Sequence, residues 1–353
     1  MRGRRFVVLA ICLALISIPA LSWGRALLRD DGLSFMGKSA AWARNHGLSP
    51  LVDVLERWRY GDAPSSTPAG KLTGGSTGTR ARVGAPEDLA VLSTRPLEGE
   101  GKWHVARRIG AKPVVWTTGL RPSAKFPSIV ASYAVFDQRY MRAVLHNGTE
   151  VPGGSNWIHG NKVSPDERRD LVFAFNGGFR GAHSAGGYFT EGRLLWRMRD
   201  GAATLAIDRN GILRMGIWGR DPGFSDRNLT SWTSVRQNLL PLLIDGVPNP
   251  ELRNGYWGGG GKGEIYVLRS GICERRDGRM LYVISGPTDA TTLASTMRDA
   301  GCTIAMQLDQ NESYPRGYVY TPTSIVELDE RMAGHPDDYV KGSLREFFAM
   351  FAR

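Results

Sequence analysis

The stretch Leu171-Val172-Phe173-Ala174-Phe175-Asn176-Gly177-Gly178-Phe179 decides the fold. Its first five residues are apolar and predict a buried strand, because a short apolar run bounded by turn residues is typical of a strand covered on both faces. The run then ends abruptly in an amide and two glycines. Such an ending places polar groups and bare backbone at the edge of a sheet, where rigid elements can position the chemistry of a loop.

A second apolar run ends in the same way further along the chain. Thr303–Leu308 predicts another buried strand, and Asp309-Gln310-Asn311-Glu312 follows it. Together the two polar turns indicate an enzyme site. Each turn taken alone is also compatible with an ordinary loop, since Asn, Gly and Asp tolerate left-handed backbone dihedrals.

Short apolar runs alternate with glycine-rich turns over the rest of the body, and few stretches have helical periodicity. One helix is predicted at Asp289–Ala300, where Leu293, Met297 and Ala300 share a face and Gly301 ends the helix. The other predicted strands are Pro113–Thr117, Ile129–Phe136, Ala143–Leu145, Ala203–Ile207, Leu213–Gly216, Pro241–Ile244, Ile265–Leu268 and Met280–Ile284. These elements predict an α+β fold, with a mixed β-sheet body and a few packed helices.

Residues 1–22 have the pattern of an export signal. Three arginines precede the apolar run Phe6–Leu21, and Ala20-Leu21-Ser22 offers small residues at the spacing that a signal peptidase requires. The alternative is an uncleaved signal anchor that extends through Leu28 and holds the protein at the membrane. The protein is therefore expected to be exported, and to be periplasmic, extracellular or membrane-anchored and facing outward.

Composition divides the remaining chain into three parts. Residues 23–60 form a short helical, membrane-proximal region, in which Pro50–Tyr60 carries apolar residues at helical spacing and is expected either on a membrane surface or against the body. Residues 61–88 are rich in Gly, Ser, Thr and Pro and predict a flexible linker. Residues 89–353 form the body, which is long enough for one large core.

The chain is basic, with 45 Lys and Arg against 34 Asp and Glu and a formal net charge of +11. Removal of residues 1–22 takes away three arginines and no acid, so the mature chain stays basic. Such a charge favours polyanions, for example a phosphate-bearing polysaccharide or anionic lipid headgroups. Nucleic acid is not an expected partner, because the basic residues are scattered and an exported protein rarely meets it.

Two cysteines, Cys273 and Cys302, remain after removal of the signal. In an oxidising compartment they could form a disulfide between two elements of the proposed site, although two separate buried thiols are equally compatible with the sequence. The chain has no His-Glu-x-x-His motif and no paired Cys-x-x-Cys motifs, and its six histidines are dispersed. No cofactor is therefore expected.

Four motifs follow one another along the body: Asn176-Gly177-Gly178-Phe179, Gly186-Gly187-Tyr188 through Glu191-Gly192, Arg269-Ser270-Gly271-Ile272, and Leu308-Asp309. In this order they resemble the phosphodiester glycosidase family, over most of residues 100–325. The resemblance implies a hydrolase that removes a sugar from a phosphodiester.

The chain departs from that family at the last motif. The family has Asp-Gly-Gly-Gly-Ser where this chain has Asp309-Gln310-Asn311-Glu312-Ser313. Backbone amides in a glycine nest can cradle a phosphate closely, whereas side chains add bulk and Glu312 adds negative charge. The departure predicts either a changed substrate specificity or a loss of activity.

Cleavage of an acetal linkage requires a carboxylate that stabilises or attacks the anomeric carbon, and Asp309 and Glu312 are the candidates. Arg269 is expected to bind a phosphate through two hydrogen bonds, and Asn176 to orient a sugar hydroxyl or the carboxylate. Each of these residues also has a structural interpretation. Asp309 and Asn176 could serve only their turns, and Arg269 could belong to an ion pair.

Four further positions are expected to border the substrate. Gly177 and Gly178 would let it approach the backbone, while Asn311 and His183, together with Glu312, would line the mouth of the site. Calcium is conceivable at Asp309 and Glu312, since it takes oxygen ligands, but two acids do not make a cage.

The sequence thus favours an exported glycosidase-like hydrolase that cleaves a glycosyl phosphodiester or related linkage in envelope or extracellular glycans. The alternative is a protein with the same fold that binds an anionic polysaccharide without cleaving it. A third possibility is a surface-structural protein organised by its amino-terminal anchor.

Overall fold

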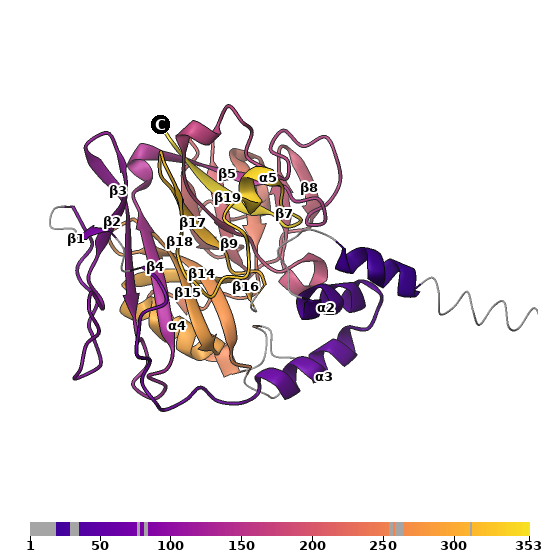
Figure 1. Ribbon diagram of the computed structural model, residues 1–353. Coiled ribbons are helices and arrows are strands. Elements are labelled where there is room, and N and C mark those ends of the chain that lie inside the picture. Colours follow the sequence, from indigo (N-terminus) through magenta and orange to yellow (C-terminus); the bar gives the residue numbers. More distant parts are fainter. Residues whose placement is uncertain are drawn as a thin grey trace, which may run out of the picture.

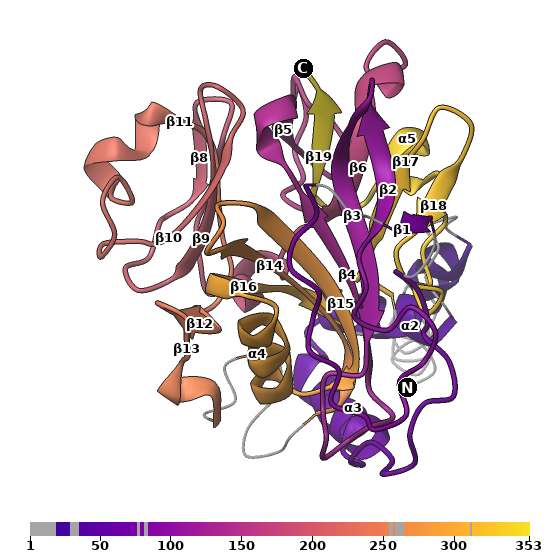
Figure 2. The same ribbon diagram turned by 90° about the vertical axis from the view of Figure 1, so that its left-hand side faces the viewer.

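The computed structural model describes residues 19–28, 35–75, 78–80, 84–253, 257, 265–310 and 313–353. Strands dominate this part of the chain and helices are few, in agreement with the predicted α+β class. Every pair of named strands is antiparallel, so three antiparallel sheets replace the mixed sheet that was expected. Figures 1 and 2 show them from two directions.

The largest sheet has nine strands in the order β1-β2-β3-β4-β15-β14-β16-β12-β13. Their bounds are β1 Thr79–Arg80, β2 His104–Ile109, β3 Lys112–Leu120, β4 Val130–Phe136, β12 Leu243–Ile244, β13 Val247–Pro248, β14 Val267–Arg275, β15 Met280–Thr288 and β16 Cys302–Gln310.

Two five-stranded sheets complete the body, in the orders β10-β9-β11-β7-β8 and β18-β17-β6-β19-β5. The first contains β7 Tyr188–Thr190, β8 Arg193–Trp196, β9 Ala203–Asp208, β10 Leu213–Ile217 and β11 Trp232–Gln237. The second contains β5 Met141–His146, β6 Leu171–Asn176, β17 Gly317–Tyr320, β18 Ile325–Glu327 and β19 Phe347–Ala352. Each of the ten strands predicted from the sequence coincides with one of the observed strands over at least part of its length.

The large sheet has apolar core on both of its faces. Along β15, Tyr282 and Ile284 belong to the core shared with β6 and β19, whereas Leu281 and Val283 belong to the core shared with α4 (Ala290–Asp299). This alternation follows from the pleat of a strand, which points successive side chains to opposite faces. Helix α4 begins after Asp289, whose carboxylate accepts a hydrogen bond from Thr292 N over 2.6 Å. The predicted helix is therefore confirmed.

Strand β6 lies in the middle of its sheet, between β17 and β19. All of its residues are buried, and Phe175 pairs with Phe348 of β19. The sequence predicted this strand from its unbroken apolar run, and the burial of all its residues shows that both faces of the strand are covered, so the run does not alternate with polar residues.

Three helical segments precede the body. Residues 19–27 are helical, α2 spans Phe35–Asn45 and α3 spans Ser49–Tyr60. Arg44 at the end of α2 forms 2.8 Å ion pairs with Asp53 and Glu56 of α3, and Tyr60 O accepts a hydrogen bond from Tyr266 N of the body over 2.9 Å. Figure 1 shows α2 and α3 together on one side of the body. None of the helices in the described segments has the length and apolarity needed to cross a membrane.

The segment 61–88, expected to be a flexible linker, contacts the body along its described residues. Ala69 N donates to Pro127 O over 3.0 Å, and Thr73 Oγ1 donates to the buried carboxylate of Asp329 over 2.9 Å. Gly75 lies so close to the backbone of Thr118 that a Cβ atom would fall 2.1 Å from its carbonyl oxygen. The segment is thus a packed arm, because its small residues fit against the large sheet where bulkier side chains would clash.

The remaining short helices are α5 (Asp338–Lys341) and the 3-10 helices η1 to η5, which span Gln138–Tyr140, Arg168–Asp170, Gly181–Ser184, Asp226–Ser231 and Pro250–Arg253.

Candidate active site

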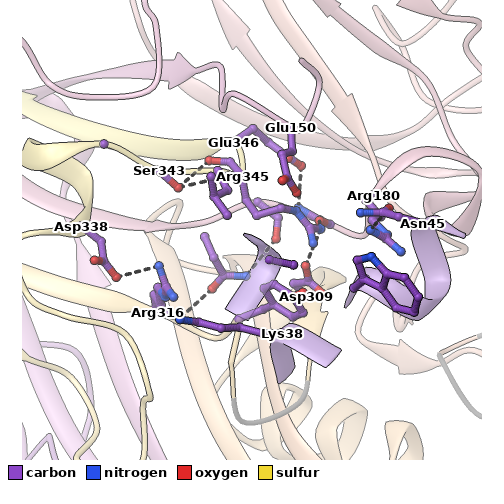
Figure 3. A pocket seen from close by; sticks show the side chains of 18 of the residues that line it. Lys38, Asn45, Glu150, Arg180, Asp309, Arg316, Asp338, Ser343, Arg345 and Glu346 are labelled. Carbon is purple, nitrogen blue, oxygen red and sulfur yellow. Dashed lines mark hydrogen bonds and ion pairs between the residues drawn. The ribbon is translucent and has the colours of Figure 1, made fainter. Parts of the chain in front are cut away.

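A cavity of about 150 Å³ lies where the polar ends of β6 and β16 meet the segment that leads into β19. Backbone hydrogen bonds join the three segments: Asp309 N donates to Gly177 O, and Gly177 N donates to Glu346 O, each over 3.1 Å. The two polar turns singled out in the sequence therefore border one hollow, as Figure 3 shows for Asp309. Its charged lining residues are Lys38, Glu150, Arg180, Asp309, Arg316, Asp338, Arg345 and Glu346.

Asp309 is the residue of β16 that faces this cavity. Its side chain is only 10% exposed, and its Oδ2 accepts a 2.6 Å hydrogen bond from Arg345 Nη2. Its Oδ1 accepts a second bond from Gln310 N over 3.0 Å. Burial raises the pKa of the Asp309 carboxyl to about 6, although the charge of Arg345 acts in the opposite direction. A carboxyl that titrates near neutral pH inside a cavity is suited to acid–base or charge-stabilising chemistry.

The side-chain amide of Asn176 joins several segments around the cavity by hydrogen bonds. Its Nδ2 donates to Gly177 O over 2.8 Å and to Ser270 Oγ over 3.1 Å, while its Oδ1 accepts from Tyr282 OH and Arg316 N. All four hydrogen-bonding positions of the amide are therefore in use. Ser270 Oγ in turn donates to Asp309 O over 2.8 Å. Asn176 borders the cavity, and its amide, expected to orient a sugar hydroxyl or the carboxylate, is committed to protein groups, one of which, Ser270, reaches the backbone of Asp309.

The two glycines after Asn176 are required by neighbouring side chains. A Cβ atom on Gly177 would lie 2.6 Å from Glu346 Cγ, and one on Gly178 would lie 2.8 Å from Asn238 Cγ. Gly178 N also donates to Glu346 Oε1 over 3.2 Å. Both glycines line the cavity as expected, but their lack of a side chain makes room first for the protein's own Glu346 and Asn238.

Arg345 and Glu346 are the site residues that the sequence analysis missed. The side chain of Glu346 is fully buried, and its Oε1 accepts from Arg236 of β11 over 2.9 Å. Its Oε2 has no hydrogen-bond partner among the described residues. The apolar run Phe347–Phe351 corresponds to β19 and directly follows this Arg-Glu pair in the sequence. A strand predicted from that run would have identified both residues as lying at its start.

Three arginines line the cavity, where four acidic residues balance the charges of these arginines and of Lys38. Arg345 lies at Asp309 and also packs over the ring of Tyr314, whose centroid is 4.7 Å from the guanidinium carbon. Arg316 pairs with Asp338 over 2.7 Å. Arg180 is half-buried and donates to Asn45 Oδ1 of α2 over 2.6 Å. Burial lowers the pKa of Arg180, so an anion that enters beside it would be attracted by a poorly solvated guanidinium.

Arg269 does not line this cavity. It is 2% exposed, and its guanidinium donates to Thr288 O over 2.8 Å, to Ile265 O over 3.0 Å and to Gln307 Oε1 over 2.9 Å. This corrects the expectation that Arg269 and Asp309 border one hollow, because Arg269 is directed into the sheet by backbone carbonyls. Arg345 occupies the position beside Asp309 that was expected for Arg269.

Gln310 belongs with Arg269 and not with the cavity. Its side-chain oxygen accepts hydrogen bonds from Arg269 Nη1 and from Gln307 Nε2. The glutamine that stands at the first glycine position of the family motif therefore does not fill the cavity. Asn311 and Glu312 lie outside the described residues, so the structure does not test the calcium site that is conceivable at Asp309 and Glu312. The described residues contain no group of three or more His, Cys, Asp or Glu that could hold a metal ion.

His183 lies in η3, after Phe179, and is exposed. It is not among the residues that line the cavity.

Cys273 of β14 and Cys302 of β16 form a disulfide, so the pairing that the sequence left open is made in the structure. This bridge lies at the opposite end of β16 from Asp309.

Helix α2 and the helix at residues 19–27 cover the open side of the cavity. Lys38, Trp42 and Asn45 of α2 line it, together with His46, which directly follows α2, and Ser22 of the preceding helix. Figure 3 shows Lys38 below Asp309, and Asn45 beside Arg180. The expectation of a position on a membrane surface or against the body concerned Pro50–Tyr60, which corresponds to α3, whereas at this site it is the preceding helix α2 that lies against the body.

Comparison with known proteins agrees with the resemblance seen in the sequence. The model of the phosphodiester glycosidase family matches residues 169–311, a segment that contains both Asn176 and Asp309. Over this segment the chain is similar to glycosidase-type hydrolases. Among curated proteins, none is significantly similar to the chain.

Solved structures that match the chain include the catalytic domain of zebrafish N-acetylglucosamine-1-phosphodiester alpha-N-acetylglucosaminidase, auto-inhibited by its pro-peptide. It has 13% sequence identity and a TM-score of 0.45, over 83% of this chain and 100% of that one. A hypothetical protein from Synechocystis has 9% identity and a TM-score of 0.39, over 68% of this chain and 62% of that one.

Proposed function

We propose that this protein is an exported hydrolase that cleaves a glycosyl phosphodiester, or a related glycosidic linkage, in envelope or extracellular glycans. The observation that carries the proposal is the pairing of Asp309 with Arg345 in a cavity that also contains Arg180. A carboxylate can stabilise positive charge at an anomeric carbon, and guanidinium groups can hold a phosphate. The disulfide Cys273–Cys302 supports export, since disulfides persist in oxidising compartments.

In the proposed reaction the bond between the anomeric carbon and the bridging phosphate oxygen breaks. Asp309, in its ionised form, stabilises the oxocarbenium-like transition state, and water supplies the oxygen that becomes bonded to the anomeric carbon, while the proton that this water loses passes to the departing phosphate. The phosphate monoester leaves with the bridging oxygen and is held by Arg345 and Arg180. Phosphate is a good leaving group that requires little proton donation, so one carboxylate and the arginines can suffice.

Glu346 has a supporting role in this proposal. Its Oε1 is committed to Arg236 and Gly178, while its buried Oε2 has no partner among the described residues. A sugar hydroxyl could donate to this oxygen and satisfy it, because a buried polar atom without a partner is costly. Glu346 would then contribute to binding of the sugar, while Arg345 and Arg180 bind the phosphate.

The cavity as observed is smaller than its proposed substrate requires. Its volume is about 150 Å³, whereas ligand pockets usually measure roughly 300–1,000 Å³. The covering side chains belong to α2, which is joined to the site through the Asn45–Arg180 hydrogen bond. We therefore infer that α2 moves away when a glycan enters.

The test is hydrolysis of glycosyl phosphodiesters and of plain glycosides by the purified chain and by Asp309→Asn. We expect the near-isosteric variant to lose about 100-fold or more of the phosphodiester turnover, since it removes the charge that the transition state requires. Asp137→Asn is the matched control, because Asp137 is also a buried partner of an arginine, Arg139, at 2.6 Å, but lies outside the cavity. This control should retain turnover.

The second candidate function is binding of an anionic polysaccharide without cleavage. It rests on the arginines of the cavity lining and on the departure from the family motif after Asp309. If neither the wild-type chain nor Asp309→Asn releases a product while both bind a phosphate-bearing glycan, the binding function is supported and the hydrolase is not.

A further inference from the structure

We propose that the outer face of α3 lies on the surface of an anionic lipid bilayer. This face, called the α3 face below, consists of Leu51, Val54, Leu55 and Trp58. The inference concerns a surface that lies apart from the cavity, and it does not depend on the proposed hydrolysis.

Exposed apolar side chains are concentrated in the amino-terminal helices. Among the described residues, nine of the thirteen large apolar side chains that are exposed lie between Leu21 and Trp58. The four members of the α3 face are 52–85% exposed, with Trp58 at 85%. Their spacing in the sequence places them along one side of the helix. A continuous apolar stripe of this kind marks an interaction surface, whereas single exposed apolar residues do not.

The polarity of α3 is the reverse of that expected for a helix whose outer side faces water. Its two acidic residues, Asp53 and Glu56, are turned toward Arg44 of α2 at 2.8 Å each. Of its apolar residues only Val52, which is 6% exposed, is buried. Tyr60 O accepts a hydrogen bond from Tyr266 N of the body, and the α3 face is exposed.

Two observations favour a bilayer over a second copy of the chain. First, Leu28 and Phe35 of the neighbouring helical segments are also exposed, and they follow the apolar run Phe6–Leu21 in the sequence. Second, the amino-terminal helices expose two arginines, Arg25 and Arg59. An apolar stripe with tryptophan and flanking arginine is the composition that lies in the interface of an anionic membrane.

The test is the depth of Trp58 in a membrane. The full chain is mixed with vesicles of phosphatidylcholine and phosphatidylglycerol whose acyl chains carry bromine, which quenches tryptophan fluorescence within the acyl region. Because the chain has ten tryptophans, the Trp58 signal is obtained as the difference between the wild type and Trp58→Phe. We expect this difference signal to be quenched and shifted to shorter wavelength when vesicles are added.

A matched pair of triple variants controls for general hydrophobicity. Leu51→Gln, Val54→Gln and Leu55→Gln keep a good helix former at each site and remove the stripe. Leu92→Gln, Ile158→Gln and Leu194→Gln remove three apolar side chains of similar exposure elsewhere on the surface. The first triple variant should lose the quenching of Trp58, and the second should keep it.

The amino-terminal apolar run could bring the full chain to vesicles by itself, so sedimentation with vesicles is not the criterion. Chains that sediment with vesicles while the Trp58 signal stays unquenched would overturn the proposal. So would a shift of Trp58 emission that follows protein concentration without lipid, since that result would assign the α3 face to a second copy of the chain.

Discussion

Arg345 Nη2 and Asp309 Oδ2 are 2.6 Å apart, although 36 residues separate them in the sequence. Arg345 also donates to Gly178 O over 3.0 Å, so one guanidinium joins the ends of β16 and β6. The carboxyl of Asp309 is thus fixed in position by a cation that can also contact a phosphate. We make four predictions for the cavity and the residues around it.

The first prediction concerns stability and pH. Burial raises the pKa of Asp309 to about 6 in the folded protein, above its ordinary value of 3.8. Between these two values the folded chain binds more protons than the unfolded chain, so stability falls as pH rises through this window. Asp309→Asn cannot ionise and escapes this loss. We expect its advantage over the wild type to grow from pH 4 to pH 6 by roughly 2–3 kcal/mol and then to level off.

Denaturant titrations of both chains at pH 4, 5, 6, 7 and 8 measure this difference in the free energy of unfolding. The other titrating groups are common to the two chains and cancel. A difference that is constant over this range would show that Asp309 titrates at its ordinary pKa.

The second prediction concerns the contribution of Arg345 to binding of phosphate. Arg345→Lys keeps the charge but cannot bind Asp309 and a phosphate with one planar group. We expect KM for a glycosyl phosphodiester to rise about tenfold, with a smaller change for a plain glycoside. Arg139 is also the partner of a buried aspartate, Asp137, and lies outside the cavity. Arg139→Lys should therefore leave KM for both substrates unchanged. An equal loss on both substrates would argue against phosphate as the group that Arg345 binds.

The third prediction concerns the space beside Gly177. Gly177→Ala would place a methyl group 2.6 Å from Glu346 Cγ, in a buried region where neither segment can move freely. We expect a loss of about 1–3 kcal/mol in the free energy of unfolding and a fall in turnover. Gly160→Ala is the control, because nothing lies within 4 Å of its Cβ position. Comparable melting temperatures for the two variants would contradict the packing role assigned to Gly177.

The fourth prediction concerns the cover formed by α2. Trp42→Ala with Asn45→Ala removes two side chains that line the cavity and also the bond from Arg180. We expect kcat/KM for a phosphate-bearing oligosaccharide to rise, and to rise less for a small glycosyl phosphodiester. Met36→Ala changes an exposed residue of the same helix that does not line the cavity. Unchanged kinetics in the double variant would show that α2 does not limit entry.

The sequence predicted the convergence of the two polar turns because each followed an apolar run long enough to be a buried strand. It also predicted α4 from its apolar face and its terminal glycine. The strand β19 lies beyond residue 325, where the resemblance to the family ended, and it was not predicted. Arg345 and Glu346 were missed with it, although they directly precede the apolar run Phe347–Phe351.

The sequence analysis placed Arg269 at the cavity, which was wrong, and the reason is physical. Its position in a strand next to β16 was foreseeable, but the direction of its side chain was not. That direction is set by carbonyl groups of Thr288 and Ile265, which the chain brings together only after folding. The same limit applies to α2, since a surface helix has no pattern in its own sequence that identifies the cavity it covers.

The four hydrogen bonds of the Asn176 amide have a consequence for mutational tolerance. An aspartate at position 176 would lack both N–H donors, and a glutamine would shift the amide group by one methylene. No other residue type can therefore reproduce the four hydrogen bonds that are made with Gly177, Ser270, Tyr282 and Arg316. In a saturation library this codon should therefore admit the narrowest range of amino acids in the region. Such intolerance would report on architecture, and it would be easy to mistake for a direct part in the chemistry.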